Sequence, residues 1–201
     1  MYEYQTLPAL TKLYQAREFP SPSKIFSALN VKQTAFFRKA IKDPNSALTK
    51  AVRSGTKIHK VLEDNKATSL FEQTVLDCFN EQIGVDIDEV WAKEKGLVSQ
   101  SKRYKGKFDG VGIFRGKLTV WDYKKTNKLK TGSQIKNYVK QLGAYAHAHD
   151  EMYGSKVEQV CLFNIAGMTN EDVVSKVFTF DPQQPIEMFL DDLNKYQNIQ
   201  Q

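Results

Sequence analysis

The spacing of hydrophobic residues divides the chain into a helical first part and a mixed second part. Up to residue 83, apolar residues recur every three or four positions, as in Leu48, Val52, Ile58 and Val61. This period is typical of amphipathic helices. We predict helices over residues 24–29, 31–41, 46–63 and 68–83, the third of them interrupted near Gly55.

Prolines are concentrated near the start of the chain. Pro8, Pro20 and Pro22 fall within residues 1–23, and proline breaks the interior of a helix. We therefore expect this segment to be irregular, with Ser23 as the cap of the first helix.

The period changes to that of β-strands after residue 83. Apolar and polar residues alternate in several segments, and one continuous apolar segment is typical of a strand buried on both faces. We predict strands over residues 85–91, 97–99, 105–114, 117–123, 157–165 and 173–180. Two further helices are predicted over residues 133–152, ended by Gly154, and 185–196. This order predicts an α/β fold, in which helices flank a mixed central sheet and the N-terminal part is mostly helical.

The composition excludes several classes of protein. The 201 residues are 41% hydrophobic, enough for one well-packed domain, and no segment approaches the length of a membrane span. Cys78 and Cys161 lie in apolar segments, which favours buried thiols over a disulfide or zinc site. The N-terminus lacks the apolar core of a secretory signal. The net charge of +6 suits a polyanionic partner in a soluble, intracellular protein.

Two acids and a lysine form the most informative local pattern. Asp109 begins one predicted strand, and Asp122 ends the next, with Lys124 on the same strand face. A hairpin through Gly116 would bring Asp109 towards the other two. Such charges are costly together unless a divalent cation or anionic substrate joins them, as in metal-dependent phosphodiester cleavage. Alternatively, Asp109 caps a turn at Gly110, and the other two residues form a surface pair.

Three further residues could complete a metal site. His59 could supply an imidazole ligand, which would favour Mn²⁺ over Mg²⁺, or it could be an exposed helical histidine. Tyr123 would contribute its backbone carbonyl, because its side chain points to the other sheet face. Glu94 could belong to the metal shell or be a solvated residue between two lysines.

A helical pair and several basic residues could contact a substrate. Gln141 and Tyr145 are spaced i, i+4 and could bind a phosphate oxygen or position Lys124. Alternatively, the tyrosine belongs to the core and the glutamine is solvated. Basic residues surround the acids and could bind phosphates, or simply solubilise the surface. They are Arg53, Lys57, Lys60, Arg103, Lys105, Lys107, Lys124, Lys125, Lys128 and Lys130. Tyr104, Tyr123 and Tyr138 could stack on unpaired bases.

Four segments in this order resemble the PD-(D/E)xK nuclease superfamily and, within it, the RecB-like exonuclease branch. They are Gly55–His59, Gly106–Gly110, Asp122–Lys124 and Gln141–Tyr145. The similarity is closest to the group of mitochondrial genome maintenance exonucleases and their phage relatives, whose opening segment resembles Phe19–Ser23. Lys125 departs from the threonine usual in that group.

The resemblance implies a restriction-endonuclease-like fold and a set of roles. Residues 1–201 would form a single nuclease domain, with 1–83 as a helical arch region and 84–201 as the catalytic sheet core. The implied metal ligands are His59, Asp109, Asp122 and the carbonyl of Tyr123. The implied catalytic residues are Lys124, Asp109, Asp122, Gln141 and Tyr145. The implied nucleic-acid-binding residues are Ser21, Ser23, Arg53, Lys57, Lys125 and Tyr145.

The resulting hypothesis is a metal-dependent DNA exonuclease that uses Mg²⁺ or Mn²⁺. Its expected partner is DNA, single-stranded or with free ends, together with replication or recombination proteins, and no membrane. The alternatives are a structure-specific endonuclease of the same fold and a non-catalytic DNA-binding module. Because no mitochondrial leader is visible, we expect a cytoplasmic protein of a bacterial or phage-infected cell rather than a mitochondrial one.

Overall fold

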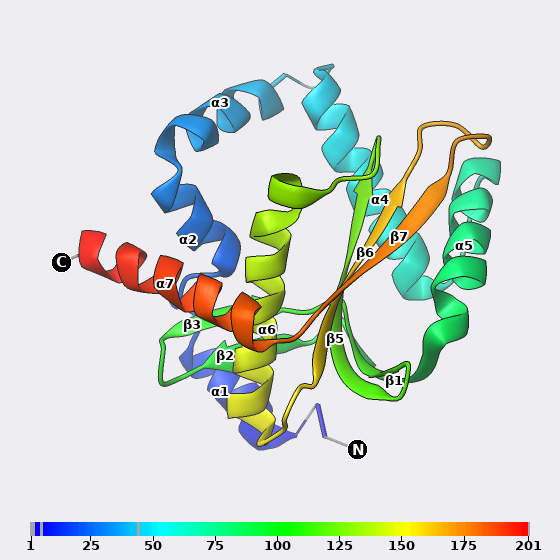
Figure 1. Cartoon of the computed structure of the whole chain (residues 1–201). Coiled ribbons are helices and arrows are strands. Elements are labelled where there is room, and N and C mark those ends of the chain that lie inside the picture. The colour runs from blue at the N-terminus through cyan, green and yellow to red at the C-terminus, as the bar shows by residue number, and fades with distance from the viewer. Residues whose placement is uncertain (1–2, 5, 44, 201) are drawn as a thin grey trace.

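A five-stranded mixed sheet forms the centre of the computed structural model, which describes residues 3–4, 6–43 and 45–200 (Figure 1). Its strand order is β1-β4-β5-β6-β7, and only the β5–β6 pair is parallel. The strands are β1 (Ile87–Lys93), β4 (Gly110–Phe114), β5 (Lys117–Thr126), β6 (Gln159–Ala166) and β7 (Val174–Phe180). The predicted mixed sheet is therefore confirmed, with β7 at its edge.

A separate two-stranded hairpin lies beside this sheet, and it includes part of one predicted strand. It consists of β2 (Gly96–Ser99) and β3 (Tyr104–Lys107). The prediction of one continuous strand over residues 105–114 was wrong, because the chain leaves the hairpin at Phe108–Asp109 and enters the main sheet as β4. Phe108 is fully buried where the chain passes between the two sheets. The alternation of apolar and polar residues does not reveal that β3 pairs with β2 whereas β4 pairs with β1 and β5.

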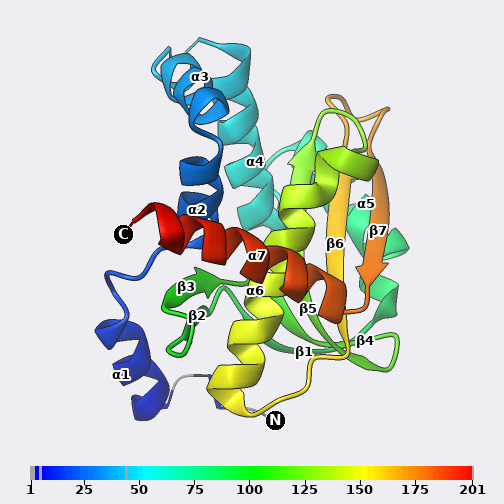
Figure 2. The ribbon, with the colours of Figure 1, turned by 60° about the vertical axis from the view of Figure 1, so that its left-hand side comes forward.

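Helices cover both faces of the main sheet (Figures 1 and 2). The crossover helix α6 joins the parallel strands β5 and β6 and packs with α7 on one face, while α4 and α5 pack on the other. The helices are α1 (Leu7–Gln15), α2 (Pro22–Leu29), α3 (Val31–Ile41), α4 (Ala47–Asp64), α5 (Leu70–Gln82), α6 (Lys136–Tyr153) and α7 (Gln183–Ile199). Two 3₁₀ turns, Gly84–Asp86 and Gly132–Ile135, precede β1 and α6.

Two hydrophobic cores follow from the alternation of side chains along the central strands. Val120 and Leu162 point into the core shared with α6 and α7, whereas Trp121 and Phe163 point into the core shared with α4 and α5. All eight residues of β6 are buried, as expected for a strand covered on both faces.

The irregular segment predicted at the start of the chain was wrong. Pro8 and Pro22 occupy the first turns of α1 and α2, where a helix needs no N–H donor. Thr6 and Ser21 accept hydrogen bonds from the first turn as caps, so Ser21, not Ser23, begins the second helix. The two prolines therefore initiate helices, and the N-terminal part is more helical than predicted.

Four further predictions concern the continuity of α4, the end of α6, the cysteines and membrane spans. Gly55 does not interrupt α4, which runs unbroken for 18 residues from the cap at Ser46. Gly154 ends α6 with a left-handed conformation, at φ 63°. Cys78 and Cys161 are buried free thiols. Within the described ranges, no helix has both the length and the apolar character needed to cross a bilayer.

Two helical glycines should respond in opposite ways to alanine. A Cβ on Gly143 would overlap the backbone of Pro185 at the α6–α7 contact, whereas a Cβ on Gly55 would meet no atom within 4 Å. We expect Gly55→Ala to raise the free energy of unfolding by about 0.5–1 kcal/mol, through helix propensity. Gly143→Ala should lower it by about 1–3 kcal/mol. Urea denaturation measures both, and equal effects would contradict the α6–α7 packing.

Candidate functional site

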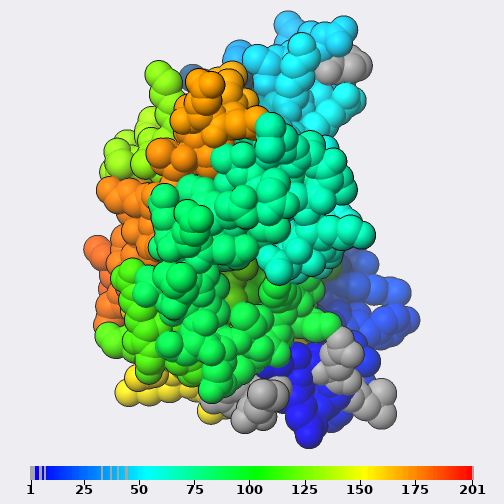
Figure 3. All heavy atoms as spheres, turned by 90° about the vertical axis from the view of Figure 1, so that its right-hand side faces the viewer, coloured from blue at the N-terminus to red at the C-terminus, as the bar shows by residue number. Residues whose placement is uncertain are grey.

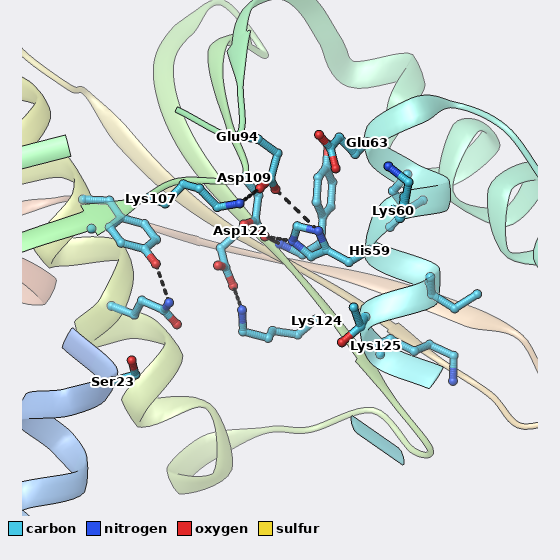
Figure 4. Close-up of a pocket in the computed structure, with 18 of the residues that line it drawn as sticks. Ser23, His59, Lys60, Glu63, Glu94, Lys107, Asp109, Asp122, Lys124 and Lys125 are labelled. Carbon is cyan, nitrogen blue, oxygen red and sulfur yellow. Dashed lines mark hydrogen bonds and ion pairs between the residues drawn. The ribbon is translucent and has the colours of Figure 1, made fainter. Parts of the chain in front are cut away.

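A cleft of about 920 Å³ lies between α2, α4, β3, β5 and α6 (Figure 4). It gathers most of the predicted site residues from segments far apart in the chain. Those that line it are Ser21, Ser23, His59, Glu94, Asp109, Asp122, Tyr123, Lys124, Lys125, Gln141 and Tyr145. Arg53 and Lys57 do not line this cleft. They lie on another side of α4, beside a second hollow.

The two aspartates meet because the β4–β5 hairpin places them on neighbouring strands. Gly110 pairs with Trp121, so Asp109, just before β4, lies next to Asp122 and Tyr123. The backbone N–H of Tyr123 donates to Asp109 Oδ2 at 2.7 Å. A Cβ on Gly110 would overlap the Trp121 ring, so glycine allows the close approach of the strands here. The predicted convergence of the acids is therefore present.

Helix α4 brings His59 to the acids from the opposite side of the cleft. Its Nε2 lies 2.7 Å from Asp109 Oδ2, and its Nδ1 lies 3.5 Å from Glu94 Oε1. Glu63, one helical turn further on, also points into the cleft (Figure 4). The ligand atoms of His59, Glu63 and Glu94 lie within 4.8 Å of one another, and this group could hold a metal ion.

Glu63 was missed by the sequence analysis, although a signal for it exists. His59 and Glu63 are spaced i, i+4 on one helix, a spacing that places two potential ligands on the same face. Lys107, noted only as one of several basic residues, forms an ion pair with Glu94 and so reaches the same group.

Lys124 contacts Asp122, whereas His59 contacts Asp109. The ammonium of Lys124 pairs with Asp122, and its Nζ is 5.4 Å from the centre of the Tyr138 ring. Gln141 donates a hydrogen bond to the hydroxyl of Tyr145 across one turn of α6, as their spacing predicted. The amine is thus enclosed between an acid and an aromatic ring.

Burial and mutual repulsion give the two aspartates different pKa values. Burial, and then the neighbouring Asp109 carboxylate, raise the pKa of Asp122 well above its ordinary range. Burial acts on Asp109 in the same sense, but the His59 hydrogen bond and the Lys124 charge outweigh it and lower its pKa. The same acids raise the pKa of His59, chiefly through the Asp109 hydrogen bond. The two neighbouring carboxyl groups therefore favour the binding of a further positive charge, either a proton or a cation.

Two buried carboxylate oxygens in the site contact cationic groups without forming a well-aligned hydrogen bond. They are Asp122 Oδ2 and Glu94 Oε1, which have no such hydrogen bond to any residue in the described part of the chain. Their close neighbours are the Lys124 ammonium and the His59 imidazole. Buried carboxylate oxygens in this state are suited to coordinate a cation.

The predicted nucleic-acid-binding residues occupy different settings. Ser21 Oγ caps α2 and lies 3.0 Å from Ser23 Oγ, at the cleft wall. Lys125 lines the cleft but donates to the carbonyls of Thr126 and Gly167, and burial lowers the pKa of its amine. Lys57 forms an ion pair with Glu72, outside the cleft.

Comparisons with known proteins leave the family open. No family model matches this chain, and no curated protein matches it significantly. Among solved structures, a Eubacterium rectale protein described as a candidate exonuclease is 11% identical, with a TM-score of 0.47 over 64% of this chain and 53% of the other. This chain thus spans about half the length of that protein. The protein SSO0001 is 15% identical, with a TM-score of 0.40 over 86% and 70%. Similarity at this level does not define a shared fold.

Replacing Asp122 should stabilise the metal-free protein. Its carboxylate is buried beside another, so Asp122→Asn is expected to raise the free energy of unfolding in EDTA by about 1 kcal/mol at neutral pH. Because the raised pKa makes the folded state favour the neutral acid, this difference should grow as the pH rises from acidic to neutral and vanish at low pH. Chemical denaturation across this pH range measures it.

Asp192→Asn provides the matched control for this experiment. Asp192 pairs with Lys140 between α6 and α7 and lines neither of the two hollows beside α4. Its replacement should lower the free energy of unfolding by roughly 3 kcal/mol, because it leaves the largely buried ammonium of Lys140 without its carboxylate. Lys124, by contrast, keeps the Asp109 carboxylate nearby when Asp122 is replaced. Destabilisation by Asp122→Asn of a similar size would contradict the proposed repulsion between the two aspartates.

Proposed function

We propose that this chain is a metal-dependent nuclease, and specifically a DNA exonuclease that acts on free single-stranded ends. The observation that carries the proposal is the convergence of Asp109, Asp122, His59 and Lys124 in one cleft with basic walls. In this proposal residues 1–201 act as one nuclease unit, with 1–83 as the helical arch region and 84–201 as the catalytic sheet core.

The residues of the cleft fit a hard divalent cation, Mg²⁺ or Mn²⁺. We propose His59, Asp109, Asp122 and the carbonyl of Tyr123 as its ligands, with Glu94 available from the adjoining group. Carboxylate and carbonyl oxygens suit both ions, and the imidazole favours Mn²⁺. The buried Asp122 Oδ2 and Glu94 Oε1 support this assignment, since neither forms a well-aligned hydrogen bond to a residue within the described ranges. A bound cation would stabilise developing negative charge and make water a stronger nucleophile near neutral pH.

Lys124 is the proposed catalytic lysine. Burial opposes its charge, but Asp122 and Asp109 outweigh burial and raise the pKa of the amine, so it stays an ammonium at neutral pH. An ammonium at this position can donate hydrogen bonds to a phosphate oxygen and neutralise charge that develops during attack at phosphorus. We propose that the hydrogen-bonded pair of Gln141 and Tyr145 orients the same phosphate group from α6.

The walls of the cleft suit a phosphodiester chain. Lys60, Lys105 and Lys107 line it together with the hydroxyl groups of Ser21 and Ser23. Ammonium and hydroxyl groups contact phosphate oxygens without regard to base sequence. A strand could therefore enter between α2 and α4 and reach the aspartates.

Loss of the Lys124 amine tests the catalytic assignment. Lys124→Ala should lower the rate of Mn²⁺-dependent cleavage of single-stranded DNA by about 10³-fold, while the dissociation constant for DNA changes by less than about threefold. Lys117→Ala is the matched control, because it removes an exposed lysine of the same strand outside the cleft. A Lys124→Ala variant that cleaves at the wild-type rate would refute the role of this lysine, and metal-independent binding without any cleavage by the wild type would favour a non-catalytic module.

Substrate topology separates exonuclease from endonuclease. We expect the protein to degrade linear single-stranded DNA in the presence of Mn²⁺ and to leave a circular single strand of the same sequence intact, because the circle has no end to enter the cleft. Gel electrophoresis of both substrates in one reaction measures this directly. Cleavage of the circle at a comparable rate would replace the exonuclease proposal with an endonuclease of the same site chemistry.

A further inference from the structure

The positive charge of the chain is concentrated in one segment. Residues 31–60, which contain α3 and most of α4, hold eight lysines and arginines but only one acid, a net charge of +7. The whole chain carries +6, so all the remaining residues together carry −1. A surface that is merely soluble does not require this segregation, whereas a polyanion-binding surface does.

Part of this charge follows one face of α4 that does not face the acids. Arg53, Lys57 and Lys60 are spaced i, i+4, i+7 and so share a side of the helix. They line a second hollow of about 550 Å³, which Lys66 and residues at the start of α5 complete. We call this hollow the rear groove. Figure 3 shows α4 and α5 next to each other on this side of the molecule.

The rear groove adjoins the cleft on the other side of α4. Val52, Thr56 and Lys60 line both hollows, so the helix forms a ridge between them. Val52 is 48% exposed on this ridge, where its side chain offers an apolar contact to a sugar or base. The basic residues from Arg53 to Lys66 follow the axis of α4 for about 15–20 Å, long enough for several successive phosphates.

The basic residues of the groove are not equally available. Lys57 pairs with the buried Glu72, whose carboxylate also accepts from Thr68 N at 2.6 Å, so this lysine is fixed to α5. Lys60 and Asp64 form an exposed pair at 3.2 Å, which contributes little and which a phosphate can displace. Arg53 and Lys66 are exposed and form no ion pair with any residue that the structure describes.

We propose that the rear groove binds the phosphate backbone of the same DNA strand whose end occupies the cleft, with the strand passing over the α4 ridge. This inference rests on the proposed nuclease function and adds a second contact region to it. The contact is through charge, so it is independent of base sequence and sensitive to salt. It requires a strand longer than the cleft alone can hold.

The test compares long and short strands on a protein that cannot cleave them. In the Lys124→Ala background, fluorescence anisotropy gives the dissociation constants for oligonucleotides of about 6 and about 20 nucleotides, one near the lower end of common single-strand site sizes and one beyond their upper end. Arg53→Ala combined with Lys66→Ala removes the two unpaired cations and leaves the Lys57–Glu72 pair intact. Lys117→Ala combined with Lys156→Ala removes the same charge from exposed sites outside both hollows.

We expect the loss of affinity to depend on the length of the oligonucleotide and on which basic residues are replaced. The Arg53/Lys66 double variant should bind the long oligonucleotide about tenfold more weakly and lower its logarithmic salt dependence by about 1.4, for two lost phosphate contacts on a single strand. Its affinity for the short oligonucleotide should change by less than about threefold, and the Lys117/Lys156 control should match the background for both lengths.

Two outcomes would overturn the inference. Equal weakening by the two double variants would mean that net charge alone matters, and unchanged binding of the long strand by the Arg53/Lys66 variant would show that the groove does not contact DNA. Neither outcome affects the proposed function, which fails instead if the wild-type protein shows no metal-dependent cleavage of DNA.

Discussion

Two carboxylates buried side by side are the constraint around which this molecule is arranged. Asp109 and Asp122 are 6% and 1% exposed on neighbouring strands, where neither charge is well solvated. Such a pair is strongly unfavourable alone, because burial and repulsion act in the same direction. Positive groups are therefore needed next to it, and each acid has one: the His59 imidazole contacts Asp109, and the Lys124 ammonium contacts Asp122.

Helix α4 supplies the His59 imidazole, and three of its faces contact different parts of the molecule. Ile58, Val61 and Leu62 bury one face against the sheet. His59 and Glu63 present a second face to the cleft, and the basic residues from Arg53 to Lys60 present a third to the rear groove. This division requires the helix to be continuous from its cap at Ser46, so the absence of a break at Gly55 matters for the site as well as for the fold.

The local features of the site could be predicted from the sequence, because they depend on regular periods. Alternation along β5 put Asp122 and Lys124 on one face, and the i, i+4 spacing joined Gln141 to Tyr145. Features that depend on packing could not be predicted in this way. The helical rotation that turns Lys57 towards Glu72 is decided by which apolar residues of α4 meet the sheet. The division of the predicted strand at Phe108–Asp109 depends on two different partner strands. Pro8 could not be interpreted from the sequence either. A proline breaks the interior of a helix but fits its first turn, and Pro8 lies in the first turn of α1.

The proposed metal site is tested most directly by anomalous diffraction from crystals soaked in Mn²⁺, recorded at the absorption edge of manganese. The account predicts one or more strong peaks within about 2.0–2.3 Å of carboxylate oxygens of Asp109 or Asp122, and near His59 and Glu94. It also predicts that the ammonium of Lys124 remains beside the ion. Ordered Mn²⁺ elsewhere on the molecule, with the direct His59–Asp109 hydrogen bond unchanged at saturating metal, would contradict the account.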